Sequence, residues 1–237
     1  QDVLKGLFDG IDFPATFVDQ DDDSVAADYS ISLMSLPFAL LNYQVTPLPQ
    51  TFILNGADDK TALDPMLLED RDKPFIGLCW QGNPSNRNDV HRSLTLEELI
   101  PHLPSEATYF NLQISLTEQQ EKRLAAHQIV NFSEGLSTLT GTAAICARLD
   151  GVIAVDTSLC HLAGSLGIPT FLLLSLASDW RWGKSTDRTV WYNNTKLFKQ
   201  TSRGEWNAPL KSLKETLERD IISPFYAGAD AGRFLGK

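Results

Sequence analysis

The stretch from Gly151 to Leu174 limits the possible folds of this chain more than any other part of its sequence. An apolar run over 152–155 ends at Asp156, a segment of small residues continues to Gly167, and Pro169 opens a second apolar run. Runs that are apolar at nearly every position are typical of parallel strands covered on both faces, and a glycine followed by a proline marks the end of a helix. The stretch therefore predicts a strand, a helix and a strand within an α/β fold.

The corner at Asp156 lies between the end of that first strand and the start of the helix. Ligands of open α/β sheets bind at the carboxyl ends of the strands, and the free amides of a first helical turn favour anions such as phosphate. The amides of Thr157, Ser158 and Leu159 are therefore candidate phosphate ligands. Asp156 and His161 are candidate partners of a sugar hydroxyl.

The same residues have a structural interpretation that the residue pattern alone supports equally well. In it, Asp156 caps the helix and His161 is a core histidine. The position of the corner at the end of a strand favours the functional interpretation.

From Pro74 onward, apolar strand patterns alternate with helical patterns of about ten residues. Strands are expected at 75–80, 109–113, 128–131, 151–155 and 196–198, with a further strand after Pro169, and helices at 95–103, 117–126, 139–149 and 209–222. Such alternation predicts a parallel, doubly wound sheet built from right-handed crossovers. The last residues, 223–237, contain three glycines without a period and are expected to form a tail.

Composition excludes several classes of protein. A net charge of −10 argues against a protein that binds nucleic acids or anionic membranes, although a local basic pocket is compatible with it. Three cysteines, Cys79, Cys146 and Cys160, give no disulfide framework, so a reduced, cytoplasmic compartment is expected. No apolar run has the length of a membrane span. Because the chain lacks an initiator methionine, we expect it to be a piece of a longer protein.

A polar loop follows the first strand of the regular region and belongs at the same carboxyl edge of the sheet. A glycine in it allows a close approach of the backbone to a ligand, and its basic residues are suited to neutralising a diphosphate. The alternative is an ordinary surface loop with solvated charges. The candidate ligand-site residues in this segment are Trp80, Gly82, Asn83, Arg87, His91 and Arg92.

Trp180 and Trp182 flank an arginine beyond the strand that follows Pro169, where an aromatic ring either stacks on a base or sugar or fills a gap in the packing. No metal site is expected, because the four histidines have no paired spacing and the acidic run at 19–23 is interpreted as a solvated loop. The chain has neither a Walker-type loop nor Gly-x-Gly-x-x-Gly, which disfavours kinases and dehydrogenases.

These segments together resemble the carboxyl-terminal domain of glycosyltransferase family 9, the heptosyltransferase-like proteins, and especially the forms attached to tetratricopeptide repeats in bacteria. The resemblance covers 73–222. It rests on four segments in the same order, which read IGLCWQGNP at 76–84, RND with RSL within 87–94, VDTS with HLAG within 155–164, and DWRW at 179–182.

The resemblance implies a two-domain fold of the GT-B type, in which the carboxyl-terminal domain holds a sugar nucleotide and the first domain holds a glycan or protein acceptor. It also implies chemistry without a metal or other cofactor, in which amides and cations stabilise the departing nucleoside diphosphate. Carried onto this chain, the amides at 157–159 would bind the diphosphate, and Asp156 and His161 the donor sugar or ribose. Arg87 or Arg92 would offset the phosphate charge.

The resemblance also defines the expected domains. These are a partial, acceptor-side amino-terminal domain with a polar linker at 1–72, a Rossmann-like donor domain at 73–222, and the tail at 223–237. The family's first domain begins with a Gly-rich loop near a carboxylate that acts as general base, and this chain contains no such loop in its first 72 residues. We therefore expect an incomplete amino-terminal domain, and the catalytic residues are unknown.

Three functions stay open at this point. The first is an inverting glycosyltransferase, the second a sugar-nucleotide-binding or protein-interaction module without chemistry, and the third a sugar-nucleotide epimerase of the same architecture. A hydrolase triad of Asp156, Ser158 and His161 is disfavoured, because residues within one helical turn point in divergent directions.

Overall fold

The computed structural model describes residues 5–8, 16, 18, 26–32, 35, 71–87, 89–184 and 187–234, with backbone only at 5, 8, 133–134 and 229–234. The acidic run at 19–23 and most of the expected linker lie outside these residues. The partial amino-terminal domain therefore stays a prediction.

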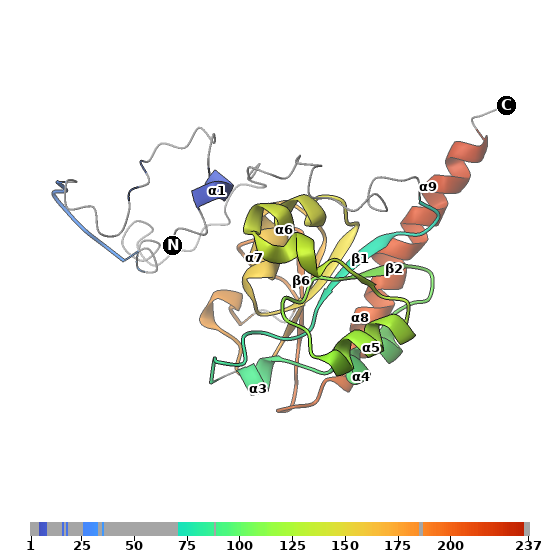
Figure 1. Ribbon diagram of the computed structural model, residues 1–237, viewed down its shortest axis with the longest axis horizontal. Coiled ribbons are helices and arrows are strands. Elements are labelled where there is room, and N and C mark those ends of the chain that lie inside the picture. Colours follow the sequence, from blue (N-terminus) through green and yellow to red (C-terminus); the bar gives the residue numbers. More distant parts are fainter. Residues whose placement is uncertain are drawn as a thin grey trace.

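Within the described residues, six strands form one sheet in the order β3-β2-β1-β4-β5-β6, and neighbouring strands are parallel (Figure 1). The strands are β1 (Phe75–Cys79), β2 (Thr108–Asn111), β3 (Val130–Asn131), β4 (Gly151–Val155), β5 (Thr170–Leu174) and β6 (Thr195–Lys199). The prediction of a parallel, doubly wound α/β sheet is confirmed. Because the chain passes outward from β1 to β3 and then places β4 on the other side of β1, the topological switch point lies between β1 and β4.

Helices cover both faces of this sheet, as the alternating side chains of β4 require. Val152 and Ala154 pack in a cluster with α6 (Leu139–Cys146) and α7 (Ser158–Ser165). Ile153 and Val155 point the other way and pack with α4 (Leu96–Leu99), α5 (Glu118–Ala126) and α8 (Asn207–Leu217). Both faces of β4 are therefore buried, which is why its sequence is apolar at every position.

The helices α4, α5 and α6 begin at threonines whose hydroxyls accept a backbone hydrogen bond from the first turn. Thr95 accepts from the amide of Glu98 at 3.2 Å, and Thr117 and Thr138 cap α5 and α6 in the same way. Each such cap contributes about 1 kcal/mol. A threonine or serine just before a helical pattern favours such a cap; the pattern left Ser93 and Thr95 open for α4, and the structure has Thr95, while Thr117 caps α5 as its pattern indicates.

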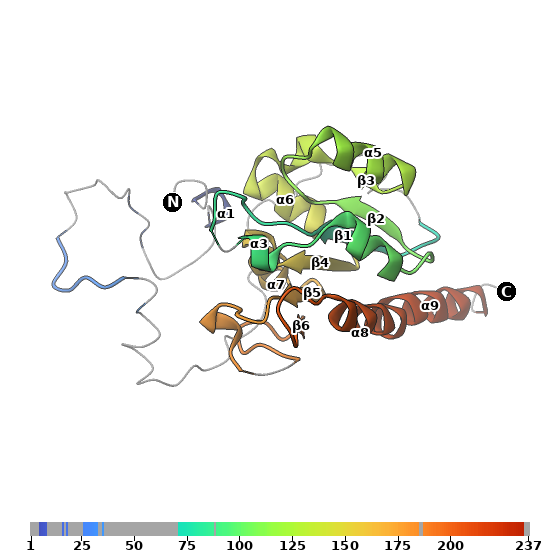
Figure 2. The same cartoon turned by 90° about the horizontal axis from the view of Figure 1, so that it is seen from below.

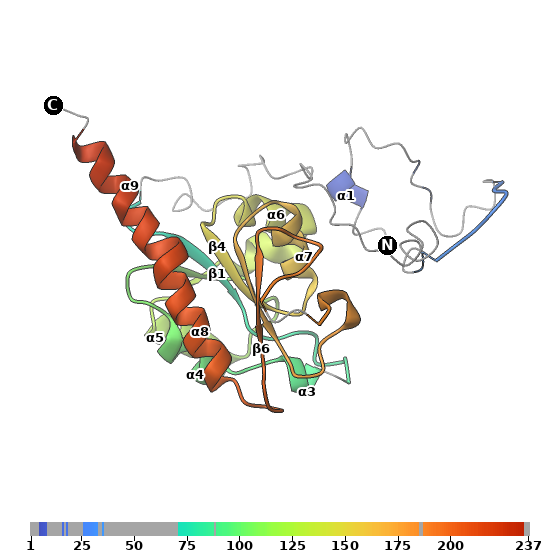
Figure 3. The same cartoon turned by 180° about the vertical axis from the view of Figure 1, so that it is seen from behind.

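The irregular tail expected at 223–237 is a helix over most of its length. After α8 comes η7 (Glu218–Ile222), one wider π-helical turn, and then α9 (Ser223–Phe234), so that the three make one rod (Figure 3). Figure 2 shows α9 extending away from the sheet. A wider turn before Pro224 accommodates a residue that lacks an amide hydrogen. Neither this rod nor any other helix in the described part of the chain is long and apolar enough to cross a membrane.

Tertiary contacts hold the start of α9, which explains why the sequence pattern did not reveal it. The hydroxyl of Tyr226 donates to the carbonyl of Glu106 at 3.2 Å, and the guanidinium of Arg71 lies 6.0 Å from the centre of the Phe225 ring. At the other end of the chain, the short helix α1 (Lys5–Phe8) buries Leu7 against α6 and α7.

Candidate functional site

A cavity of about 670 Å³ opens at the carboxyl ends of β1, β2 and β4. Its walls are formed by the residues that follow these three strands, by the start of α5 and by α6. The cavity therefore includes the switch point between β1 and β4, where ligands of doubly wound sheets bind. Its volume lies within the range of sites for small molecules.

The first wall is the loop after β1, which contributes Gly82 and Asn83. The amide of Gly82 donates to the hydroxyl of Ser93 at 2.9 Å, which closes this loop upon itself. A Cβ atom at Gly82 would lie 2.2 Å from Oδ1 of Asp89 and 2.4 Å from Nη2 of Arg92. A methyl group at this position would therefore force the Asp89 and Arg92 side chains, or the loop itself, to shift.

Arg92 lies behind this wall, and its side chain does not point into the cavity, where it was expected to offset phosphate charge. Its Nε donates to Asp89 at 2.9 Å, and its Nη1 donates to the backbone carbonyl of Asp156 at 2.7 Å. Asp89 is a buried carboxylate, 8% exposed, and it lines the cavity, whereas Arg92 is not among the lining residues. The short helix α3 (Asp89–Arg92) carries both partners of the ion pair within the loop that was expected to be irregular.

The second wall is the amino-terminal end of α7, which brings Thr157, Ser158 and Leu159 to the cavity as predicted. The side chain of Thr157, at the N-cap position, makes no capping hydrogen bond. Its hydroxyl donates instead to the carbonyl of Val155 at 3.3 Å. Since the first amides of a helix have no partner within the helix, this end of α7 presents amide donors without a side-chain cap.

Three glutamines form a polar network along the cavity, and sequence reasoning did not identify them. Oε1 of Gln113 accepts from the amide of Gln81 at 3.1 Å, and Nε2 of Gln120 donates to Oε1 of Gln81 at 2.8 Å. Gln113 follows β2 and Gln120 lies in the first turn of α5, so the rule that sites form at strand ends would have found them. Asp89 was missed as a cavity residue because it lies within a loop whose course the pattern does not define.

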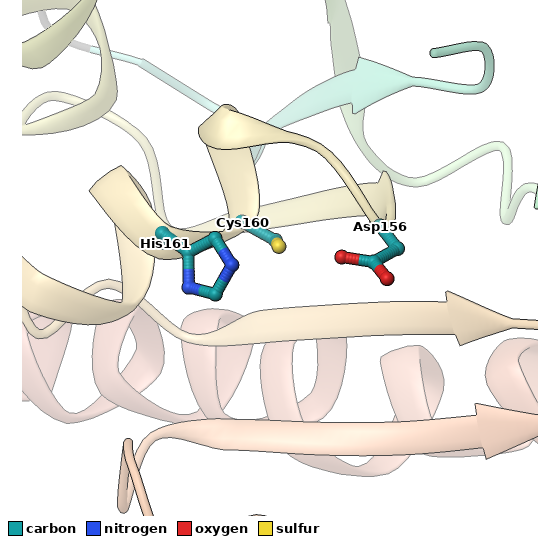
Figure 4. Close-up of side chains that lie close together, drawn as sticks. All are labelled: Asp156, Cys160 and His161. Carbon is teal, nitrogen blue, oxygen red and sulfur yellow. The ribbon is translucent and has the colours of Figure 1, made fainter. Parts of the chain in front are cut away.

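A second group of polar side chains lies around the start of α7. Figure 4 shows Asp156, Cys160 and His161 close together, with one ligand atom from each lying within 4.8 Å of the others. The thiol of Cys160 donates to the carbonyl of Thr157 at 2.9 Å, and burial raises its pKa. These residue types can ligate zinc, but here the thiol donates to a backbone carbonyl.

His161 is held between aromatic rings. Its ring stacks on Trp182 with centroids 5.0 Å apart, and its Nδ1 lies 3.0 Å from the hydroxyl of Tyr192. Burial lowers the pKa of His161, so the ring is neutral at pH 7. The side chains of Asp156 and His161 are not among those that line the 670 Å³ cavity.

The basic side chains that were expected to neutralise a diphosphate do not line this cavity. Arg87 is exposed and lines a separate hollow of about 450 Å³ beside α4. His91 is also exposed, and its Nε2 lies 3.0 Å from Nη2 of Arg203. Among the described residues that line the 670 Å³ cavity there is no lysine, arginine or histidine, and Asp89 is the one carboxylate.

The tryptophans fall into different environments. Trp80 is fully buried in the core beneath the loop after β1, so it supports the site without touching the cavity. In η6 (Trp180–Trp182), Trp182 is buried and Trp180 is 58% exposed, with the guanidinium of Arg181 lying 5.8 Å from the centre of its ring. The packing interpretation therefore applies to Trp182, and Trp80, a candidate ligand-site residue, is part of the core.

The sheet order and the cavity at its carboxyl edge define a Rossmann-like domain. No protein family model matches the chain. Protein FlbA of Caulobacter vibrioides is 29% identical to it over 158 residues, which are 63% of this chain and 26% of FlbA.

Two solved structures are similar in fold. One is E. coli ADP-heptose lps heptosyltransferase II, with a TM-score of 0.46 and 18% identity over 72% of this chain and 53% of that chain. The other is the glycosyl transferase family 9 protein of Veillonella parvula DSM 2008, with a TM-score of 0.40 and 10% identity over 67% and 41% of the two chains. The chain thus spans about a quarter of FlbA and about half of the heptosyltransferase.

Proposed function

We propose that this chain is the donor-binding part of a GT-B-type glycosyltransferase. The complete protein would transfer a sugar from a nucleoside diphosphate sugar to a glycan or protein acceptor, without a metal and with inversion at the anomeric carbon. The observation that supports this most is the end of α7 without a side-chain cap, which opens into a 670 Å³ cavity opposite Gly82.

The chemistry that this arrangement suits is the departure of a charged group. As the bond to the sugar breaks, negative charge accumulates on the diphosphate. Backbone amides already aimed at that charge stabilise it without reorganisation, and the positive end of the helix dipole adds to their effect. The amides of Thr157, Ser158 and Leu159 would act in this way.

The remaining lining of the cavity suits the rest of a nucleotide. Leu112, Leu139 and Leu162 supply apolar surface, and Gln113 and Gln120 supply amide groups for polar edges of a base or ribose. A site with mostly apolar walls and a few placed polar groups is typical of ligand pockets. The donor would therefore be bound mainly by neutral groups.

Inversion needs a general base on the acceptor side. Asp89, the lining carboxylate, is unsuited to this task because Arg92 holds it as an ion pair. We therefore expect the base to come from outside the described residues. The same observation favours a second candidate function, a domain that binds sugar nucleotides without chemistry.

Isothermal titration calorimetry with UDP, ADP and GDP sugars tests the proposal, followed by an assay for release of the nucleoside diphosphate. We expect one nucleotide class to bind. Binding without release, in a protein that includes its full amino-terminal part, would favour the binding module. Conversion of one bound sugar into its epimer would favour the epimerase. No binding of any nucleotide would contradict all three.

A further inference from the structure

Two walls of the cavity come from segments far apart in the sequence, and Arg92 connects them. Arg92 lies in the loop after β1. Its guanidinium donates to the carbonyl of Asp156 in the corner after β4, 64 residues away in sequence. The side chains of Arg92 and Asp89 are only 20% and 12% exposed. Charge-assisted hydrogen bonds in such a half-buried place are stronger and shorter than neutral ones.

The carbonyl that Arg92 holds belongs to the peptide unit that also contains the amide of Thr157. A trans peptide is planar, with its carbonyl and its amide hydrogen pointing in opposite directions. Fixing the oxygen of Asp156 therefore fixes the direction of the Thr157 amide. The N-cap residue Thr157 uses its own hydroxyl elsewhere, so this carbonyl is a main external anchor of the corner.

Two of the three nitrogens of the Arg92 guanidinium donate hydrogen bonds within the protein. Nε donates to Asp89 and Nη1 donates to the carbonyl of Asp156, while Nη2 lies where a Cβ atom at Gly82 would come within 2.4 Å of it. Asp89 also offsets the charge of the guanidinium. A group used in this way is poorly placed to bind a phosphate itself.

We propose that Arg92 is a positioning residue, which fixes the amide end of α7 opposite Gly82 through its bonds to Asp89 and to the carbonyl of Asp156. The effect on ligand binding rests on the proposed function, but the effect on the corner does not. Arg92 thus acts on the diphosphate through the Thr157 amide and not by direct contact.

The corner itself is tested first, by ¹⁵N relaxation of the protein without ligand. In Arg92→Gln we expect the order parameters of the amides at 157–159 to fall from about 0.85 to below about 0.6. Arg71→Gln is the matched control, because Arg71 also donates to a carbonyl and to a carboxylate, those of Arg148 and Asp150. It should leave the amides at 157–159 unchanged. Unchanged values in Arg92→Gln would overturn the proposal.

Pyrophosphate binding then separates positioning from direct contact. Asp89→Asn removes a negative charge from the cavity, so electrostatics alone predicts tighter binding of pyrophosphate. If Arg92 positions the corner, Asp89→Asn removes the carboxylate that holds Arg92, and pyrophosphate should bind to this variant at least about threefold more weakly. The Asp89→Asn, Arg92→Gln double variant should then bind pyrophosphate no worse than Arg92→Gln alone. Tighter binding by Asp89→Asn would overturn the role of Arg92. Absence of pyrophosphate binding by the unaltered protein would count against the proposed function, and the relaxation data would still decide whether Arg92 holds the corner.

Discussion

Thr157 directs its hydroxyl to the carbonyl of Val155, at 3.3 Å, and so leaves the first turn of α7 without a side-chain cap. Thr95, Thr117 and Thr138 stand at the same position of their helices and each accepts a hydrogen bond from a first-turn amide. Among the four helices that begin at a threonine, α7 is thus the one whose first-turn amides receive no side-chain cap, and its amino terminus lies at the carboxyl edge of β4.

Thr157→Asp should make the protein more stable and weaken its binding of diphosphate. The N-cap backbone is extended, which suits an aspartate that accepts from the first-turn amides. We expect a gain of about 0.5–1 kcal/mol in the free energy of unfolding, measured with denaturant. The new carboxylate would occupy the first-turn amides of α7 and repel a bound anion. Calorimetry should therefore show the affinity for pyrophosphate reduced at least about tenfold.

Thr157→Val is the control for this change, because it keeps the branched shape and adds no charge. It should lose some stability with the hydroxyl and retain most of the affinity. A Thr157→Asp variant that bound pyrophosphate normally would show that the amides of α7 are not the anion site.

Gly82→Ala should disturb the wall that faces α7. Its methyl group would lie 2.2 Å from Oδ1 of Asp89, so either the ion pair with Arg92 or the loop must move. We expect a loss of about 1–3 kcal/mol in the free energy of unfolding, together with weaker ligand binding. Gly228→Ala is the control, since nothing lies within 4 Å of its added methyl group and alanine favours a helix. Equal stability of the two variants would contradict the close packing at Gly82.

His161 should make the protein less stable at mildly acidic pH. Burial lowers its pKa in the folded state below the usual 6.5. At a pH between these two pKa values, the unfolded chain binds a proton on His161 that the folded chain does not bind. Stability from this group is therefore complete above about pH 6.5 and is lost as the pH falls toward the folded-state pKa. The slope cannot exceed about 1.4 kcal/mol per pH unit.

Denaturant unfolding between pH 5 and 8 checks this, with His161→Gln as the variant. The difference in unfolding free energy between the unaltered protein and the variant should shrink as the pH falls below about 6.5. The variant also reports on packing, because its amide can still reach Tyr192. A difference that stayed constant with pH would mean that His161 titrates normally.

Cys79 should react slowly with iodoacetamide at pH 7.5 and be protected further by a bound ligand. Burial raises the pKa of this thiol to about 11, and its sulfur lies at the wall of the cavity. The thiolate is the reacting form, so the rate should rise about tenfold per pH unit up to that pKa. Mass spectrometry of the alkylated peptides measures it, with buried Cys146 as internal reference. Rapid alkylation at pH 7.5 would contradict the enclosure of Cys79.

The sheet, and part of the lining of the cavity at its carboxyl edge, could be predicted from the sequence because both follow from local patterns. Apolar runs such as 151–155 are apolar since both of their faces are buried, and a polar residue after such a run necessarily lies at the carboxyl edge. Thr157, Ser158 and Gly82 were chosen as candidates in this way, and the structure places them in the lining of the cavity.

The basic residues could not be assigned from the sequence, because their partners are distant. Arg92 has the charge to hold a phosphate, but it donates to the carbonyl of Asp156 instead. That hydrogen bond depends on the pairing of β1 with β4, which the local sequence does not reveal. His161 likewise packs on Trp182 and Tyr192. Trp80 belongs to the core because it packs in one cluster with the residues of α4. Contacts of this kind also stabilise α9, which has no apolar period over its full length.

The proposed function depends on a diphosphate contacting the amide end of α7. The most direct measurement is an amide ¹H–¹⁵N NMR titration of the protein with the nucleoside diphosphate that calorimetry selects. We expect the resonances of Thr157, Ser158 and Leu159 to shift, together with that of Gly82, which also lines the cavity, and we expect inorganic pyrophosphate to shift the first three. Saturable shifts confined to other parts of the chain, with the amides at 157–159 unmoved, would contradict it.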